Sequence, residues 1–305
     1  MDDKITLWNV TIAPTHKCNL RCRDCYSNSG SNSERLDDTT IDTLLEDATK
    51  TWPSLLFFTL TGGEPFIDDI ALNIARRHPD KYFQVYTNGL LIDERVAENI
   101  KELGNITPLI SVEGWGIETD SVRGKGTYEK VNNVMNHLTD LDLFWGISFK
   151  LTSQNAHVHD EGFVDYFISK GAQCGRFLTY MPTGRGSDLL KVPSTEQRRR
   201  QKEVLERVDP SFLTVDYINN PTELLNGCAA AGLRYVYVDP TGDVHPCVFM
   251  PNSARFNLKD VYAGVHKAEN VENLNDMLLK DSTMRRVRKE ARKRSQERCC
   301  MILDS

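Results

Sequence analysis

The chain has 305 residues, 40% of them apolar and 26% charged, so it can bury a large core and does not have a disordered or fibrous composition. Its net charge of −6 gives no overall electrostatic reason to expect nucleic acid as a partner. No run approaches the roughly 18 consecutive apolar residues of a membrane span, and the start, Met1-Asp-Asp-Lys-Ile, lacks the basic and apolar parts of a signal peptide. We therefore expect a soluble cytoplasmic protein with neither membrane nor nucleic acid as a partner.

From about residue 5 to residue 181, apolar runs of strand length alternate with amphipathic stretches, which is typical of β/α repetition and a parallel sheet. The clearest amphipathic stretch follows Asp37 and places Ile41, Leu44, Leu45 and Ala48 on one helix face. Six such repeats fit a six-stranded partial barrel and an open doubly wound sheet equally well. The predicted strands cover residues 7–13, 55–60, 82–86, 108–112, 144–151 and 176–180.

The sequence changes character after the last repeat. Residues 196–208 predict a charged helix that we interpret as a linker. Beyond it, predicted strands at 234–238 and 244–249 flank a turn sequence, Asp239-Pro-Thr-Gly. We therefore predict three parts, namely a barrel at 1–192, a helical linker at 193–218 and a smaller domain at 219–305.

Eight cysteines in a cytoplasmic protein indicate metal binding or catalysis rather than disulfides. Three of them, Cys18, Cys22 and Cys25, have the spacing Cys-x3-Cys-x2-Cys. Three thiolates on a 4Fe–4S cluster leave one iron without a protein ligand, where a small molecule can bind. A zinc site usually has four ligands, and only His16 lies nearby as a fourth. Three unrelated core cysteines are the other alternative.

This spacing, just after an apolar stretch, resembles that of the radical S-adenosylmethionine (SAM) enzymes. The resemblance implies an α/β fold with a partial (β/α)6 TIM-like barrel. It also implies that the open iron chelates the amino and carboxylate groups of SAM. One electron then cleaves SAM to methionine and a 5′-deoxyadenosyl radical.

A second motif, Thr61-Gly-Gly-Glu-Pro65, follows the second predicted strand. Two glycines allow a sharp turn and close approach to a ligand. On its own the motif also fits an ordinary strand-to-helix turn. After the cysteine motif it resembles the family's GGEP motif, which implies that Gly62, Gly63 and Glu64 bind the SAM amino group. Thr87-Asn88-Gly89 resembles the family's TNG turn, although Asn-Gly is also a common turn dipeptide.

Ser111 and Glu113 end the fourth predicted strand, where relatives commonly have Ser-x-Asp-Gly near the SAM ribose and carboxylate. Glu in place of Asp makes the side chain one methylene longer. Arg123 resembles an arginine that binds the SAM carboxylate, and its alternative role is a surface loop charge. The residue before the third cysteine, often aromatic in the family, is Asp24. We therefore expect the backbone of Tyr26 to meet the adenine.

Further along, Cys228 and Cys247 have the spacing Cys-x13-Gly-x4-Cys. This resembles the first half of a SPASM or twitch domain, which implies a second, auxiliary 4Fe–4S cluster. Only Cys299 and Cys300 remain to complete it, so four thiolates, three thiolates with an open iron, or a zinc site all stay possible. Cys174 stands alone, and we expect a buried, inert thiol.

A basic segment, residues 284–298, has eight Arg or Lys and two Glu. It fits a solvated helix face or, alternatively, a surface that attracts an anionic substrate, a leader peptide or an acidic electron donor.

The resemblance implies an oxidoreductase or maturase that removes a hydrogen atom from its substrate. We expect peptide modification, assisted by the auxiliary cluster, with a donor such as flavodoxin or ferredoxin. Oxidation or rearrangement of a small metabolite (an aminocyclitol, tetrapyrrole or cofactor precursor) is the first alternative. A non-enzymatic iron–sulfur or zinc carrier is the second.

Overall fold

The structure is a computed structural model that describes residues 5–188, 191–216, 228–250 and 254–293. At its centre lies one nine-stranded sheet with the order β7-β6-β5-β4-β3-β2-β1-β8-β9. Within the described residues, neighbouring strands are parallel except for β8 and β9, which are antiparallel. The strands are β1 Asn9–Ile12, β2 Phe57–Leu60, β3 Phe83–Thr87, β4 Ile106–Val112, β5 Gly146–Leu151, β6 Cys174–Thr179, β7 Leu213–Asp216, β8 Tyr235–Val238 and β9 Val244–His245.

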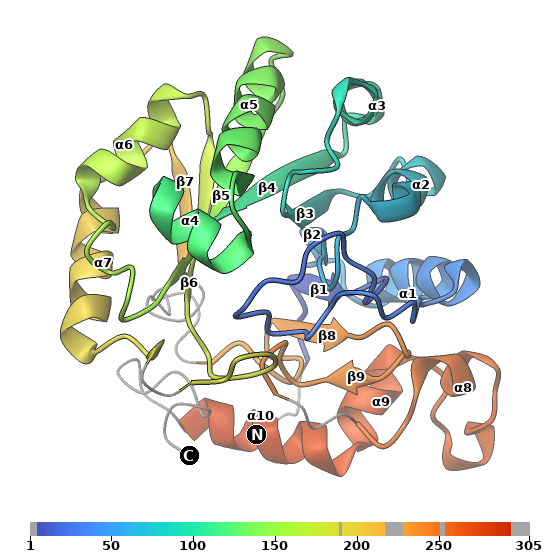
Figure 1. Cartoon of the computed structure of the whole chain (residues 1–305). Helices are drawn as coiled ribbons and strands as arrows, with labels where there is room; N and C mark the ends of the chain where they lie inside the picture. Colours follow the sequence, from blue (N-terminus) through green and yellow to red (C-terminus); the bar gives the residue numbers. More distant parts are fainter. Residues whose placement is uncertain (1–4, 189–190, 217–227, 251–253, 294–305) are drawn as a thin grey trace.

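Helices cover the outside of the curved sheet (Figure 1). Several of them begin at a capping side chain, as at Asp37, Asp93 and Ser194. The helices on the outer face are α1 Asp38–Thr51, α2 Ile70–Arg77, α3 Glu94–Leu103, α5 Thr127–Asp140, α6 Glu161–Ser169 and α7 Thr195–Arg207. Short 3-10 turns cover Ile67–Asp69 and Lys267–Glu269.

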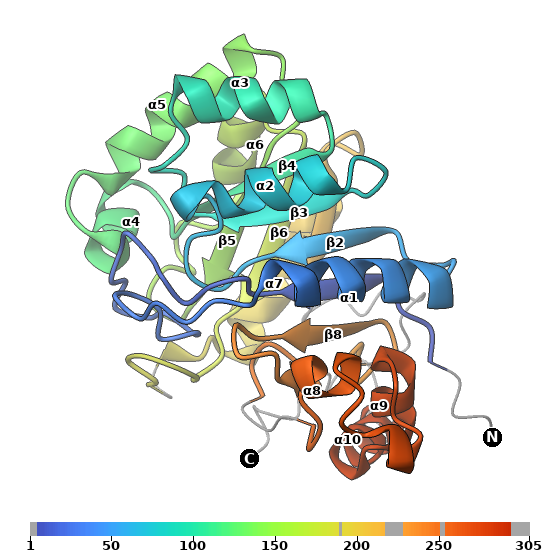
Figure 2. The ribbon, with the colours of Figure 1, turned by 90° about the vertical axis from the view of Figure 1, so that its right-hand side faces the viewer.

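The inner face of the sheet carries buried polar side chains. Phe58 and Phe83 belong to the apolar core, whereas Thr59 and Gln84, which follow them and point to the opposite face, are polar and buried. Parallel register aligns these polar positions across strands, for example Thr11 with Thr59 and Ser111 with Ser148. In parallel sheets with helical crossovers the carboxyl ends of the strands form one rim, where ligands bind. The loop after β1 and helix α4 Gly116–Arg123 lie at this rim (Figure 2).

The six predicted strands are confirmed as β1 to β6, but the sheet extends beyond them. Helix α7 and strand β7 lie in the segment interpreted as a linker, and β7 pairs with β6 in parallel. The segment was interpreted as a linker because α7 buries only a narrow stripe, including Gln201 and Val204, and is otherwise charged. The predicted hairpin is confirmed as β8 and β9, and β8 joins the free edge of β1. The sheet therefore crosses both predicted domain boundaries.

Three helices, α8 Leu258–Tyr262, α9 Leu274–Lys280 and α10 Ser282–Lys293, pack beside β8 and β9 (Figure 1). Asp47 of α1 accepts hydrogen bonds from the Tyr262 hydroxyl (3.0 Å) and the Leu274 amide (2.9 Å). Within the predicted solvated basic segment, Arg288 is instead fully buried and donates to the Ala231 and Leu278 carbonyls. No described helix has the length and apolar content needed to cross a membrane.

Candidate functional site

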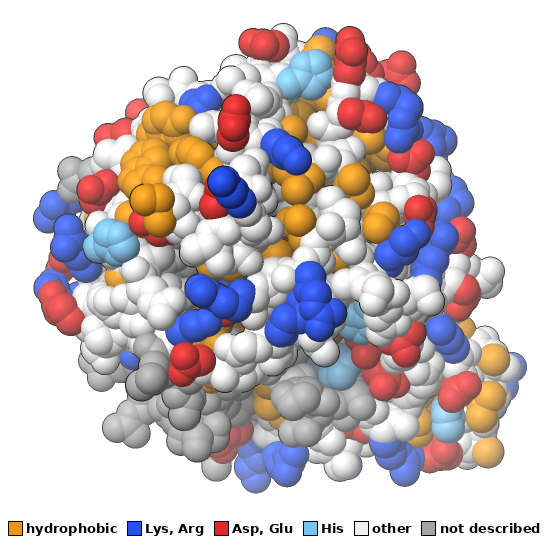
Figure 3. Space-filling view, viewed as in Figure 1, with side chains coloured by type: hydrophobic (Ala, Val, Ile, Leu, Met, Phe, Trp, Pro, Cys, Tyr) orange, Lys and Arg blue, Asp and Glu red, His pale blue; other side chains and the backbone are white. Residues whose placement is uncertain are grey.

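A cavity of about 280 Å³ opens at the rim formed by the strand ends. Figure 3 views the face that contains this rim, with Lys and Arg side chains gathered near its middle. The cavity brings together residues that are far apart in the chain, from Asn9 to Phe249. Of the predicted site residues, those lining it are Cys18, Cys22, Cys25, Tyr26, Gly62, Gly63, Glu64, Asn88, Ser111, Glu113, Arg123, Cys228 and Cys247.

The loop between β1 and α1 carries three of the cysteines. Its two arms pair with each other, because the Cys18 amide donates to the Gly30 carbonyl (2.8 Å) and the Gly30 amide to the His16 carbonyl (3.1 Å). The pKa of the Cys18 thiol is raised to about 11, chiefly by burial and in addition by Glu64, Cys22 and Cys25, while the Leu20 amide opposes the increase. Burial also raises the pKa of the Cys22 thiol. Thiols with a raised pKa ionise readily near neutral pH only when a cation joins them.

The Gly62-Gly63-Glu64 turn packs against this loop. A Cβ atom at Gly63 would overlap the Lys17 carbonyl oxygen, and one at Gly62 would lie 2.6 Å from the Ala13 Cβ. The Gly63 amide donates to the Thr15 carbonyl (2.8 Å), and the Glu64 amide to the Lys17 carbonyl (2.9 Å). The glycines are therefore required by the approach of the two backbones, in addition to any approach of a ligand.

Glu64 connects this turn to the next one. Its buried carboxylate accepts hydrogen bonds from the Thr87 hydroxyl (2.7 Å), the Asn88 amide (2.8 Å) and the Phe66 amide (3.2 Å). Burial raises the pKa of the Glu64 carboxyl, and these donors oppose the increase. The Asn88 side chain in turn donates to the Asn19 side chain (2.7 Å). The predicted GGEP and TNG turns thus support the cysteine loop together.

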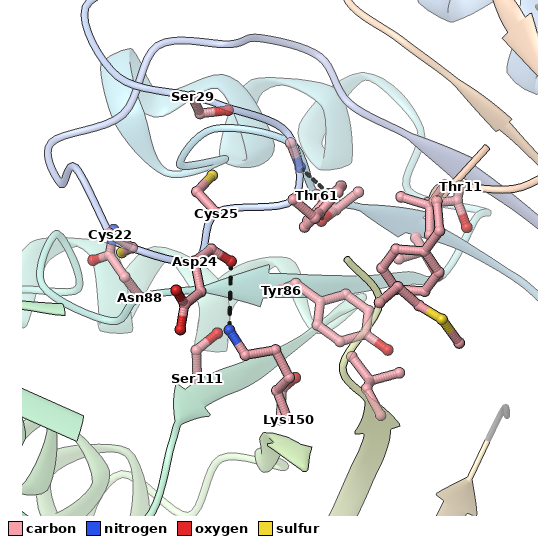
Figure 4. Close-up of a pocket in the computed structure, with 18 of the residues that line it drawn as sticks. Thr11, Cys22, Asp24, Cys25, Ser29, Thr61, Tyr86, Asn88, Ser111 and Lys150 are labelled. Carbon is pink, nitrogen blue, oxygen red and sulfur yellow. Dashed lines mark hydrogen bonds between the residues drawn. The ribbon is translucent and has the colours of Figure 1, made fainter. Parts of the chain in front are cut away.

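Glu113 and Arg123 form a buried ion pair at the cavity wall. Nη2 of Arg123 lies 2.8 Å from Oε1 of Glu113, and Nζ of Lys150 lies 3.5 Å from Oε2. Burial disfavours the charge of Arg123, but the Glu113 carboxylate keeps the pKa of the guanidinium raised. Arg123 is thus not the surface loop charge that the sequence left open. Ser111 faces the same part of the cavity (Figure 4).

Tyr26 and Asp24 hold the cysteine loop through their side chains. The Tyr26 hydroxyl lies 2.8 Å from the Thr61 hydroxyl and accepts from the Gly62 amide (3.2 Å). Burial raises the pKa of Tyr26 to about 12. The Asp24 carboxylate is buried in an ion pair with Lys191. The predicted contact of the Tyr26 backbone with adenine stays a prediction.

The second pair of cysteines reaches the same cavity from the β8–β9 hairpin. Cys228 and Cys247 both line it, as does Tyr235. The Tyr235 hydroxyl donates to Sγ of Cys247 (2.7 Å). Their predicted co-ligands, Cys299 and Cys300, lie outside the described residues. Cys174 is buried within β6, as expected of an inert thiol.

Residues 12–156 match the sequence model of the Radical SAM superfamily. Residues 12–156 thus form a radical SAM domain.

The domain has curated relatives of moderate similarity. The mycofactocin maturase MftC of Mycolicibacterium smegmatis is 29% identical over 79% of this chain and 63% of its own length. The subtilosin biosynthesis protein AlbA of Bacillus subtilis is 26% identical over 83% of this chain and 57% of its own length. The chain thus spans about three fifths of these two relatives.

Solved structures agree with the fold. Streptococcus suis SuiB bound to its precursor peptide SuiA superposes with a TM-score of 0.69 at 18% identity, covering 85% of this chain and 66% of SuiB. The radical SAM fold, an α/β fold with a mostly parallel sheet, is therefore confirmed.

Proteins with a radical SAM domain use a 4Fe–4S cluster and SAM. The described residues fit these groups, because three thiols from one loop and a pair of cations line one cavity. The described side chains include no group of three or more His, Cys, Asp or Glu assembled as a metal site. His16, the possible fourth zinc ligand, does not line the cavity.

Three further residues that contact the site carry no motif in the sequence. Lys150 projects from the end of β5 into the cavity, and its Nζ is 3.5 Å from the Asp24 carbonyl (Figure 4). Lys191 neutralises Asp24. Arg185 contacts the cysteine loop from beyond β6. The only indication of these residues in the sequence around them is a polar or glycine-rich stretch near the end of an apolar strand.

Proposed function

We propose that the chain is a radical SAM enzyme that modifies a peptide. SAM is cleaved reductively to methionine and a 5′-deoxyadenosyl radical, which takes a hydrogen atom from the substrate. The observation that carries the proposal is one cavity lined by a Cys-x3-Cys-x2-Cys loop, the Gly62-Gly63-Glu64 turn and buried Arg123. An electron donor such as flavodoxin or ferredoxin supplies the electron.

In this proposal Cys18, Cys22 and Cys25 hold the SAM-binding cluster. When bound, that cluster would supply the electron for the cleavage and a binding site for SAM. The protein itself binds and orients SAM and the substrate, and it excludes water from the cavity.

The predicted SAM contacts extend this proposal. Gly62, Gly63 and Glu64 would receive the amino group. Since Glu64 already accepts three protein hydrogen bonds, it has room for about one more donor. Arg123 and Lys150 share the single carboxylate of Glu113, so the wall carries one positive charge in excess. That excess suits the SAM carboxylate.

Cys228 and Cys247 are proposed to hold an auxiliary 4Fe–4S cluster together with Cys299 and Cys300. Their position on the same cavity supports a role close to the substrate. A hydrogen bond from Tyr235 to Cys247 is of the kind that adjusts the potential of such a centre.

The peptide substrate is supported by the relatives. MftC is named a maturase, AlbA serves the biosynthesis of a bacteriocin, and SuiB was solved with a precursor peptide. A small-molecule substrate is the second candidate, because the pre-heme d1 synthase of Dinoroseobacter shibae is 26% identical over 79% of this chain and 67% of its own length.

The first experiment measures 5′-deoxyadenosine formed from SAM and dithionite after anaerobic reconstitution. Cys18→Ala should abolish it, whereas the matched control Cys174→Ala, which removes a thiol away from the cavity, should retain it. Formation at the wild-type rate by Cys18→Ala would show that the cysteine loop is not the cluster site.

The substrate class is tested by turnover with a peptide fraction and with a small-metabolite fraction of the source cells. A peptide whose mass shifts supports the proposal, and a shifted metabolite overturns its peptide part. Iron is counted in parallel. About eight irons per chain, falling to about four in the Cys18/Cys22/Cys25 triple-alanine variant, supports two cubane clusters. Zinc, or failure to bind SAM, would instead indicate a metal carrier.

A further inference from the structure

The segment after β6, residues 183–187, lies across the back of the cysteine loop and is called the strap here. Its central residue, Arg185, makes three hydrogen bonds to that loop. The amide donates to the Cys25 carbonyl (2.8 Å), Nη1 to the Cys22 carbonyl (2.9 Å) and Nη2 to the Ser29 carbonyl (2.5 Å). A residue about 160 positions away along the chain thus supplies a partner for the Cys22 and Ser29 carbonyls, and a second one for the Cys25 carbonyl, which also accepts from the Asn28 amide (3.3 Å).

The residues on both sides of Arg185 are glycines, and the contact requires them. A Cβ atom at Gly184 would overlap the Cys25 and Tyr26 carbonyl oxygens, and one at Gly186 would lie 2.5 Å from the Arg23 carbonyl oxygen. Both glycines also have positive φ, +72° and +66°. The Gly-Arg-Gly sequence is therefore what a close approach of strap and loop demands.

The charge of Arg185 is not neutralised within the described part of the chain. No described carboxylate lies within 4.0 Å of the guanidinium, and its buried Nε has no hydrogen-bond partner. The nearest counter-charges available to it are the partial charges of the loop carbonyls. Three thiolates and their cluster at this loop would provide a negative centre for this cation.

We propose that Arg185 is a positioning residue that fixes the Cys22–Cys25 part of the loop before iron is bound. It also keeps a permanent cation behind the thiolates. Cys18 is held separately, by the backbone pairing with Gly30. The strap and this pairing together explain how three cysteines on a long loop stay directed at one cavity without a metal. The effect on the cluster rests on the proposed function, whereas the effect on the loop does not.

The loop is tested first in iron-free protein, by amide hydrogen exchange. The amides of Arg23 and Asn28 are hydrogen bonded, to the Val122 and Cys25 carbonyls, and report on the Cys22–Cys25 part of the loop. Arg185→Met should speed their exchange about tenfold or more, because two charge-assisted hydrogen bonds are lost. Arg185→Lys should give an intermediate rate. Arg21→Met, a matched change at an exposed arginine of the same loop, should leave exchange unchanged.

Unchanged exchange in Arg185→Met would overturn the proposal. Exchange of β4 amides serves as the fold control, since the proposal predicts faster exchange in the loop and not in the sheet. If β4 exchanges faster as well, Arg185 supports the whole fold and the positioning role is wrong.

The charge is tested in reconstituted protein, by the midpoint potential and electron paramagnetic resonance spectrum of the reduced cluster. A nearby cation stabilises the reduced state, so Arg185→Met should lower the potential, and Arg185→Lys should restore most of it. Equal potentials in wild type and Arg185→Met would overturn the charge effect. If wild type binds no cluster, the proposed function fails while the hydrogen-exchange result still decides the positioning role.

Discussion

Arg123 and Glu113 are buried partners, with Nη2 and Oε1 2.8 Å apart at the cavity wall. Replacing Arg123 with Gln leaves the Glu113 carboxylate with only Lys150, 3.5 Å away, among its described ion-pair partners. We expect iron-free Arg123→Gln to lose about 3 kcal/mol of unfolding free energy, which is typical of a broken buried pair. Urea unfolding measures it. The double variant Arg123→Gln/Glu113→Gln should recover much of the loss; equal instability of single and double variants would contradict the pair's role.

Gly63 tests the contact between the GGEP turn and the cysteine loop. Because a Cβ atom there would overlap the Lys17 carbonyl oxygen, Gly63→Ala should displace the loop and reduce the iron retained after reconstitution. Gly30→Ala is the matched control on the same loop, since its nearest neighbour would be 3.7 Å away. Iron per chain measures both. Full iron retention by Gly63→Ala would show that the loop can move aside without consequence.

Glu64 is expected to stabilise the fold as well as the site. Gln at this position keeps the size but lacks one acceptor oxygen, so the Thr87 hydroxyl or the Asn88 amide loses its partner. We expect a loss of about 1–3 kcal/mol, which is the cost of an unsatisfied buried group. The exposed Glu98→Gln on α3 is the control. Equal urea midpoints for the two variants would rule out this role.

His159 makes stability depend on pH. It is buried among Phe149, Phe163 and Phe177, and neither ring nitrogen has a hydrogen-bond partner among the described residues. Burial lowers the pKa of its imidazole from 6.5 to about 4. Between about pH 6.5 and pH 4, the His159 imidazole thus stays neutral in the folded protein, whereas it binds a proton in the unfolded chain. Stability is therefore retained above about pH 6.5 and lost progressively down to about pH 4, by about 3 kcal/mol in total.

His159→Leu should remove this part of the pH dependence of the urea midpoint. His157→Leu, which changes an exposed histidine close by, should leave it in place. The idea is wrong if both variants lose stability with falling pH as wild type does.

The parts of the site that the sequence predicted are local. Cys18, Cys22 and Cys25 are close in the chain, and Glu64 and Asn88 each follow a strand whose end reaches the common rim. The sequence pattern alone is enough to place such residues.

The missed residues depend on contacts between distant segments. Asp24 and Lys191 are separated by 167 positions, and no spacing rule relates them. Lys150 was visible as a charge near the end of a predicted strand, and Gly184-Arg185-Gly186 as a glycine-rich turn after another. The extension of the sheet by β7 was not predicted, because the sequence of a short strand after a charged helix resembles that of a linker.

The pairing of β8 with β1 has a consequence for electron transfer. Asn9 to Ile12 align one by one with Tyr235 to Val238, so the strand before Cys18 and the hairpin before Cys247 are joined by backbone hydrogen bonds. The separation of the two thiol sets is thereby fixed by sheet register and not by the angle between two mobile domains. Any electron-tunnelling distance between centres at these sites is therefore set when the chain folds. A chain cut before β8 would lose this fixed distance, and it would also lose the strand that pairs with the edge of β1.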